Sequence, residues 1–253
     1  MTPSLAPSLR LLAILAALAA PLAPARALVG AAPDGRFADR VAMVLIRGGD
    51  EAGFCSALVL SPRILLTAAH CLRPLRDMAV HYRDPSGAAV IIPVDNAVAH
   101  PLYRPDAIQA RVESIDLALI RTTRALDPPF VSAAIAAGEP PAIGAAAIVS
   151  GYGAAREGDW ASGGTLRSVA LAVREPASKV LIWAADPAGR EAGACNGDSG
   201  APIWSADGST AIAIVAWAQA PHGHGCGGLT QGPLLAPLRG WIEETERRLS
   251  SAS

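Results

Sequence analysis

Short apolar runs separated by turn-forming residues constrain this chain more than any other feature of its sequence. In the first half of the chain these runs lie at residues 41–46, 57–60, 64–68, 89–94 and 117–120. Glycine, proline, aspartate and serine gather between them, at residues 48–50, 61–62, 84–87 and 100–101. Apolar runs this short, bounded by turn residues, are typical of strands rather than helices. Their regular spacing predicts a β-barrel or a β-sandwich.

The second half of the chain continues the same pattern and then ends differently. Strands are expected at residues 145–149, 166–173, 180–183 and 212–217, and the proline-rich stretch 127–141 is expected to be a linker. Four apolar residues and one threonine then recur at helical spacing between charged residues: Leu238, Trp241, Ile242, Thr245 and Leu249. This spacing predicts a short amphipathic helix that packs one face against the body of the protein.

Charge and composition exclude several classes of protein. The chain has 21 Lys plus Arg against 22 Asp plus Glu, a net charge of −1, which argues against nucleic-acid binding, since phosphate contacts need a clustered basic surplus. Charged residues make up only 17%, beside 24 Gly and 21 Pro, so neither a coiled coil nor a charge-driven disordered chain fits.

The first 27 residues have the features of a secretory signal peptide. Arg10 precedes an apolar run at residues 11–20, and the small-residue triplet 25–27 supplies an A-x-A cleavage site. A transmembrane anchor is the alternative, but the run is about half of the ~20 residues that a spanning helix needs. We therefore expect a secreted or periplasmic protein that is not membrane-bound after cleavage.

Export changes how the four cysteines are interpreted. Cys55, Cys71, Cys195 and Cys226 are expected to form disulfides, because such bonds persist outside the cytosol. Spacing alone leaves three pairings open. A zinc site is the weaker alternative, since the chain has no C-x-x-C pair.

Three segments carry residues suited to nucleophilic catalysis. They hold His70 in L-T-A-A-H-C, Asp116 in D-L-A-L-I, and Ser199 in C-N-G-D-S-G-A-P. A serine hydroxyl needs a base that takes its proton as it attacks; an imidazole suits that task, and a carboxylate can orient the imidazole. Each residue alone has a structural interpretation, as a core histidine, a strand cap and a turn. The ordered combination favours chemistry.

In these motifs the chain resembles the chymotrypsin-like (trypsin-fold) serine proteases, over nearly all of residues 28–249. The order His70, Asp116, Ser199 is that family's order. Further similarities lie at residues 28–31, 100–103, 151–153 and at Trp217. The resemblance implies an all-β fold of two antiparallel six-stranded β-barrels with a C-terminal α-helix. The barrels would span residues 28–130 and 131–236, and the helix and tail would span 237–253.

The resemblance also implies a role for each site residue. Ser199 would be the nucleophile, His70 the general base and acid, and Asp116 the orienting carboxylate, with the amides of Gly197 and Ser199 as the oxyanion hole. It further implies two disulfides, Cys55 with Cys71 and Cys195 with Cys226.

Activation in this family depends on an ion pair between a freed N-terminal amine and the carboxylate before the catalytic serine. Here the pair would be Leu28 and Asp198. Because the A-x-A site ends where Leu28 begins, we expect signal peptidase to free this amine. A separate cut after Arg26, which leaves Ala27 first, is the alternative.

The specificity pocket that the resemblance implies consists of Gly193, Ala194, Ala218 and Gly232. It holds no carboxylate for an Arg or Lys side chain, so apolar residues are expected before the scissile bond. Two departures from the family pattern stand out. Ala216 replaces a serine that commonly helps to hold the aspartate, and the segment 219–225 is longer than usual.

The combined expectation is a serine endopeptidase that acts on polypeptide substrates, with protein inhibitors as further candidate partners. We expect a monomer without cofactor or metal, because His222 and His224 lack a third ligand and fit a solvated loop better. A non-catalytic binding protein on the same fold is the main alternative. An α/β-hydrolase esterase is less consistent, since Ser199 lies in G-D-S-G-A rather than G-x-S-x-G and the histidine comes first.

Overall fold

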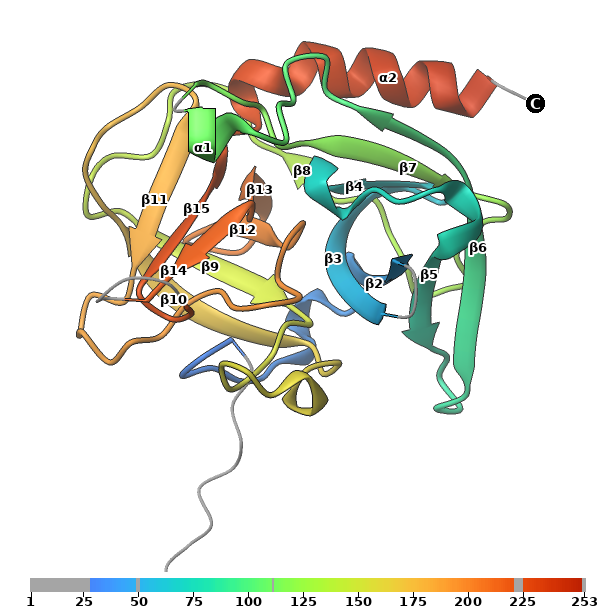
Figure 1. The fold of residues 1–253 in the computed structure, drawn as a ribbon, viewed down its shortest axis with the longest axis horizontal. Coiled ribbons are helices and arrows are strands. Elements are labelled where there is room, and N and C mark those ends of the chain that lie inside the picture. The colour runs from blue at the N-terminus through green and yellow to red at the C-terminus, as the bar shows by residue number, and fades with distance from the viewer. Residues whose placement is uncertain (1–27, 49–50, 111, 221–224, 252–253) are drawn as a thin grey trace, which may run out of the picture.

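The structure is a computed structural model that describes residues 28–48, 51–110, 112–220 and 225–251 (Figure 1). The predicted signal peptide and the histidines at 222 and 224 lie outside the described residues.

The first half of the chain forms a closed six-stranded barrel. Its hydrogen-bonded order is β2-β3-β4-β7-β6-β5, and every neighbouring pair is antiparallel. The strands are β2 (Val41–Gly48), β3 (Glu51–Ser61), β4 (Ile64–Thr67), β5 (Met78–Arg83), β6 (Ala89–Ala99) and β7 (Ala118–Thr122). Closure leaves no free strand edge in this half of the molecule.

The second half forms a nine-stranded sheet. Eight strands follow the order β14-β15-β11-β10-β9-β12-β13-β8, and β1 pairs with β10. They are β1 (Ala32–Pro33), β8 (Ala134–Ile135), β9 (Ala146–Gly151), β10 (Arg167–Val173), β11 (Leu181–Ala185), β12 (Pro202–Ser205), β13 (Thr210–Ile214), β14 (Trp217–Gln219) and β15 (Leu229–Pro233). A bridge between Ala213 and Leu234 brings β13 back to the end of β15, so six of these strands curl into a second barrel-like body. The predicted all-β class is confirmed.

Three details differ from the expectation. The strand expected at 212–217 is divided into β13 and β14, because Val215 exchanges backbone hydrogen bonds with Gly200 and Ala201 while Ala216 bonds to Gln231. The expected linker 127–141 contains β8, which pairs with β13 in parallel. Strands β1, β5, β12 and β15 were not predicted.

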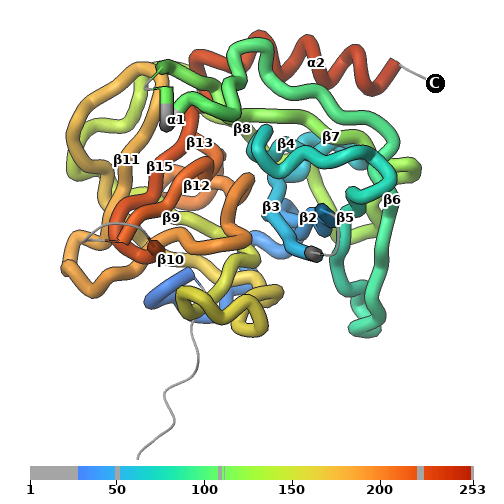
Figure 2. The backbone as a smooth tube through the Cα atoms, viewed as in Figure 1, coloured from blue at the N-terminus to red at the C-terminus, as the bar shows by residue number. Residues whose placement is uncertain are grey.

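The start of the described chain lies with the second half rather than the first. Ala32 and Pro33 pair with Ser168 and Arg167 of β10, and Figure 2 shows this segment, in blue, beneath the second sheet. Residues 28–33 therefore brace the barrel that carries Ser199, although they precede the first barrel in sequence. The proposed boundary between residues 130 and 131 stays a prediction.

The helices are α1 (Ala107–Ala110) and α2 (Arg239–Ser251), and α2 is the expected C-terminal helix. It lies across the top of the molecule in Figure 1 and buries Ile242 and Leu249 in the apolar cluster that joins the two halves. In that cluster Phe37 stacks on the buried Trp204 with ring centroids 4.8 Å apart. No helix within the described ranges is long and apolar enough to cross a membrane.

Candidate active site

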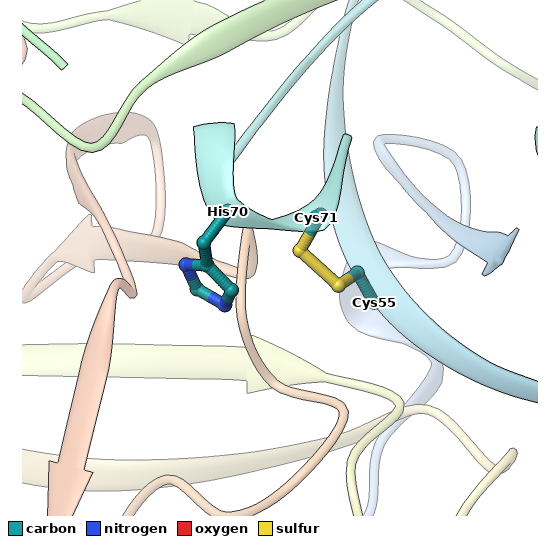
Figure 3. Close-up of side chains that lie close together, drawn as sticks. All are labelled: Cys55, His70 and Cys71. Carbon is teal, nitrogen blue, oxygen red and sulfur yellow. A yellow bond between two sulfur atoms is a disulfide. The ribbon is translucent and has the colours of Figure 1, made fainter. Parts of the chain in front are cut away.

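His70 lies in a single 3-10 turn, Ala69–Cys71, directly after β4. The disulfide between Cys55 and Cys71 ties this turn to β3, with an S–S distance of 2.02 Å. Figure 3 shows the imidazole leaving the turn away from the disulfide. Strand β4 and the disulfide therefore fix the backbone of His70, while its side chain is 37% exposed.

Asp116 precedes β7 and holds His70 at two points. Its Oδ2 lies 2.6 Å from the ring Nδ1 of His70, and its Oδ1 accepts a hydrogen bond of 2.9 Å from the backbone N–H of the same residue. A carboxylate on Nδ1 sets the tautomer that leaves Nε2 as the acceptor. Strands β4 and β7 are neighbours, so the barrel itself brings the two residues together.

Ser199 completes a chain of three side chains. Its Oγ lies 2.8 Å from Nε2 of His70. The backbone of this residue is joined to the first barrel, because Ser56 donates its N–H to the carbonyl of Ser199 at 2.8 Å. The three sequence motifs, which lie far apart along the chain, thus meet between the two halves of the molecule.

The glycines on either side of Asp198-Ser199 are required by the backbone. Gly197 has φ +94° and Gly200 has φ +83°, in the region that disfavours side chains. Space excludes a side chain as well: a Cβ at Gly197 would overlap the Phe54 ring, and one at Gly200 would overlap the carbonyl of Ser56. The G-D-S-G motif is therefore dictated by the turn that presents the hydroxyl.

Two amide donors beside Ser199 are unpaired. Neither the N–H of Gly197 nor that of Ser199 donates to any group in the described part of the chain. The amide between them is not free, because the N–H of Asp198 donates to the carbonyl of Cys195 at 3.0 Å. Free amides at such a turn suit an anionic oxygen.

Asp198 is fully buried behind the Ser199 turn. Its Oδ1 accepts the N–H of Gly153 at 2.8 Å, and its Oδ2 accepts that of Cys195 at 3.0 Å. Burial raises its pKa to about 7, although the two amide hydrogen bonds and the charge of Arg167 act in the opposite direction. The carboxylate fills the space next to Gly151 and Gly153, where a Cβ would overlap its oxygens, and this explains the G-Y-G motif.

Leu28 is completely buried, with φ 45°. The next residue, Val29, bridges to Gly193, whose N–H donates to the Val29 carbonyl at 3.1 Å. This places the start of the described chain against the segment that leads to Asp198. In the full sequence Leu28 follows Ala27 and has no free amine, so no ion pair with Asp198 is expected in the uncut chain.

Both expected disulfides are present. Cys195 and Cys226 are joined with a Cα–Cα distance of 4.6 Å, besides the Cys55–Cys71 bond.

The one cluster with possible metal ligands among the described residues is Cys55, His70 and Cys71, whose ligand atoms lie within 4.8 Å of one another (Figure 3). Its sulfurs are disulfide-bonded and offer no thiolate, so these residues do not suit zinc.

Two cavities meet at His70. One, of about 490 Å³, is lined by Ser199 and by Gly197, Asn196, Ala218 and Cys226, among others. The other, of about 660 Å³, lies on the Asp116 side and is lined by Tyr103, Glu113 and Gln219. His70, Ala216 and Trp217 line both. Together they form a groove that passes His70, and the half-buried Ser199 lines it.

The four residues expected in the specificity pocket lie at different places relative to the cavity beside Ser199, and their role stays a prediction. Ala218 lines the cavity beside Ser199, but Gly193, Ala194 and Gly232 do not. A Cβ at Gly193 would lie 3.0 Å from Oγ1 of the buried Thr230, which accepts the N–H of Ala194 at 3.0 Å. Thr230 also faces Ala218 across strands β14 and β15.

Gly232 lies against the backbone of Ile214. A Cβ there would overlap the carbonyl of Ile214, so this glycine allows two backbones to approach closely. Sequence reasoning missed Thr230 because the unusual length of segment 219–225 hides the position of β15. Thr230 lies between Leu229 and Gln231, where no apolar pattern marks it as a pocket residue.

Because residue 216 is alanine and not the serine common in the family, it offers no hydrogen bond to Asp116. Ala216 lines the cavity beside Asp116, and the only hydrogen bonds to the Asp116 carboxylate within the described residues come from His70. The charge of Asp116 also contributes, after burial, to raising the pKa of Tyr103 nearby.

Comparison with known proteins decides the family. A family model described as Trypsin matches residues 31–232. The chain belongs to the trypsin family. Among its relatives, trypsin alpha-4 of Lucilia cuprina is 30% identical over 222 residues, covering 78% of this chain and 79% of the relative. Trypsin beta of Drosophila erecta is 27% identical over 219 residues, covering 78% and 80%.

Solved structures place this trypsin-family chain in the same fold. Neuropsin, a serine protease expressed in the limbic system of mouse brain, superposes with a TM-score of 0.65 at 22% identity, over 81% of this chain and 93% of that one. Human heparin binding protein superposes with a TM-score of 0.67 at 19% identity, over 85% and 95%. At this identity the similarity establishes the fold alone.

Proposed function

We propose that this trypsin-family chain is an exported serine endopeptidase whose catalytic residues are Ser199, His70 and Asp116. One observation carries the proposal: the side chains form an unbroken series, 2.8 Å from Ser199 Oγ to His70 Nε2 and 2.6 Å from His70 Nδ1 to Asp116 Oδ2, and the series opens onto a groove. This is the arrangement that activates a hydroxyl for attack on a peptide carbonyl.

In the first step, Ser199 Oγ attacks the substrate carbonyl while Nε2 of His70 takes its proton. Asp116 stabilises the imidazolium that forms and keeps the ring from rotating, because it also holds the backbone of His70. The imidazolium then returns the proton to the leaving amine, which departs as an acyl-enzyme forms on Ser199. Water hydrolyses the acyl-enzyme through the same proton transfers in reverse order.

The negative oxygen of each tetrahedral intermediate would be bound by the free N–H groups of Gly197 and Ser199. These donors are held in place before substrate arrives, because the turn is fixed by Asp198 and by the glycines on either side of it. Loss of one such donor typically costs about 3 kcal/mol of transition-state stabilisation.

The pocket supports cleavage after small apolar residues. Thr230 occupies the depth that a long side chain would need, and Ala218 opposite it narrows the space further. The walls that Ala218 and Thr230 form carry no negative charge, so cleavage after Arg or Lys is disfavoured. The carboxylate that does line the cavity, that of Glu157, lies beside Gly225 and accepts the N–H of Cys226 at 3.4 Å. Peptide profiling that showed a preference for basic residues would contradict this assignment.

Export and activation belong to the same proposal. The two disulfides are compatible with an oxidising compartment, and Leu28 is already buried, next to the Val29 bridge to Gly193. Removal of residues 1–27 would free the Leu28 amine, whose charge would offset the cost of ionising the buried Asp198. N-terminal sequencing of the exported protein tests this step, which requires a start at Leu28 rather than further downstream.

The alternative is a non-catalytic binding protein on the same fold, and one solved structure with this fold carries the name heparin binding protein. The complete series of hydrogen bonds from Asp116 to Ser199 favours catalysis. The sheets are antiparallel except for the pair of β8 and β13, which disfavours the α/β-hydrolase alternative, since that fold is built on a mostly parallel sheet.

A fluorophosphonate probe separates catalysis from binding. The exported protein should be labelled at Ser199, and His70→Ala should lose labelling because the hydroxyl is no longer activated. Ser162→Ala provides a control serine outside the groove. A wild-type protein that folds and stays unlabelled at pH 8 would favour the binding protein.

A further inference from the structure

Arg167 is a buried arginine without an adequate partner. It is 7% exposed, and its Nε has no hydrogen-bond acceptor in the part of the chain that the structure describes. Its Nη1 makes only long contacts, 3.4 Å to the carbonyl of Ser162 and 3.3 Å to that of Thr165. A guanidinium is seldom buried without a carboxylate or a full set of acceptors, so its position needs an explanation.

The sheet register directs Arg167 toward Asp198. Arg167 of β10 lies directly opposite Gly151 of β9, and opposite residues of an antiparallel pair project from the same face. That face of Gly151 is occupied by the Asp198 carboxylate, which would overlap a Cβ there. The one residue on β10 that faces the buried carboxylate from across the strand pair is therefore a permanent cation.

The two charges influence each other. The charge of Arg167 acts to lower the pKa of Asp198 against the larger effect of burial, and the charge of Asp198 acts to raise that of Arg167 against burial. Within the described residues no other charged side chain acts on Asp198. The remaining candidate cation is the amine that cleavage would free at Leu28.

We propose that Arg167 is a positioning residue, which supplies from strand β10 a permanent positive charge that holds the Asp198 carboxylate ionised and inward. The N–H groups of Gly197 and Ser199 would then stay aimed at the groove even when the amine at Leu28 is uncharged. This inference rests on the proposed function for its catalytic consequence, but the coupling between Arg167 and Asp198 does not depend on catalysis.

A double-mutant cycle tests the coupling without any activity measurement. Melting temperatures are compared at pH 8 for the exported wild type, R167Q, D198N and the double variant. R167Q should lower the melting temperature by about 4 °C or more when Asp198 is present, and by less than about 1 °C in the D198N background. An equal drop in melting temperature in both backgrounds would overturn the proposal. It would mean that Arg167 stabilises the protein through its contacts with the carbonyls of Ser162 and Thr165 and not through Asp198.

The pH profile of peptide hydrolysis tests the catalytic consequence. A free α-amine titrates near pH ~8, whereas a guanidinium stays charged to above pH ~12. Between pH 8 and pH 10 the kcat of wild type should change by less than about twofold, while that of R167Q should fall about tenfold or more as the amine loses its charge. R167K should behave like wild type at pH 8 and 9.

The matched control is R174Q, which removes an exposed arginine just after the same strand. It should follow wild type in both measurements. If R167Q does not fold, R167M, which keeps the apolar stem, takes its place. Parallel pH profiles for wild type and the Arg167 variant would contradict the catalytic part of the proposal. A wild type without hydrolytic activity would instead contradict the proposed function, and the melting cycle would still decide the coupling.

Discussion

Asp116 binds His70 twice, through the ring Nδ1 at 2.6 Å and through the backbone N–H at 2.9 Å. The carboxylate therefore fixes the imidazole and the turn that carries it as one unit. Ala216 offers no hydroxyl to Asp116. Among the described residues, His70 alone therefore makes hydrogen bonds that orient the Asp116 carboxylate.

Asp116→Asn tests this relationship. The amide can still accept the backbone N–H of His70, but its NH₂ group would favour the wrong ring tautomer. We expect kcat to fall by about 10⁴ with little change in melting temperature, the loss known for this substitution in a triad of this kind. A large drop in stability instead would mean that Asp116 mainly supports the fold.

Ala216→Ser would restore the hydroxyl that the family commonly has beside the aspartate. A third hydrogen bond to Asp116 should raise kcat by a few-fold at most, because the carboxylate is already held at two points. Steady-state hydrolysis of one peptide by both proteins measures the change. Loss of activity in Ala216→Ser would show that the site has adapted to the smaller residue.

Thr230→Gly should deepen the specificity pocket. Removing this side chain frees the space next to Gly193, so the ratio of kcat/KM for a Phe peptide over an Ala peptide should rise about tenfold or more. Thr230→Ser, which keeps the hydroxyl that accepts the Ala194 N–H, is the control and should retain the preference for small residues. An unchanged ratio in Thr230→Gly would place the pocket elsewhere.

Gly200→Ala should destabilise the protein by about 3 kcal/mol or more, since both its positive φ and the carbonyl of Ser56 oppose a side chain. Gly87→Ala is a matched control, because Gly87 has a similar φ of +85° with no atom within 4 Å of an added Cβ. It should cost only about 1 kcal/mol, from backbone strain alone. Chemical denaturation of both variants measures the free energy of unfolding. Equal losses in the two variants would show that the close approach to Ser56 does not contribute to the effect.

Asp198 makes the stability of an uncut chain depend on pH. Its pKa is about 7 in the folded state against 3.8 for an ordinary aspartate, so the folded state favours the protonated form. The uncut chain should therefore lose stability as pH rises from about 4 through 7. Asp198→Asn should melt several degrees higher than the uncut wild type at pH 8 and at about the same temperature at pH 4. A constant difference across this range would contradict the buried ionisation.

The sequence predicted the parts of this structure that depend on local chemistry. The glycines of G-D-S-G are dictated by positive φ, and the apolar runs at 64–68 and 117–120 correspond closely to β4 and β7. The meeting of His70, Asp116 and Ser199 was expected only through the family resemblance, since nothing in their spacing brings the three segments together.

What the sequence did not predict depends on long-range packing. Strand β15 contains Gly232 and Pro233, which weaken any strand pattern, and its place is fixed by β11 and β14 on either side. Together with the unusual length of segment 219–225, this hid the position of Thr230. The burial of Arg167 could not be predicted from the sequence either, because the register between β9 and β10 is what places this residue on the side of Asp198.

The most direct test of the central claim compares wild type with Ser199→Ala in the hydrolysis of a peptide library. The account predicts cleavage by wild type after small apolar residues, and a loss of about 10⁴-fold or more in kcat for Ser199→Ala with an unchanged melting temperature. Cleavage by Ser199→Ala at the wild-type rate, with both proteins folded, would contradict it.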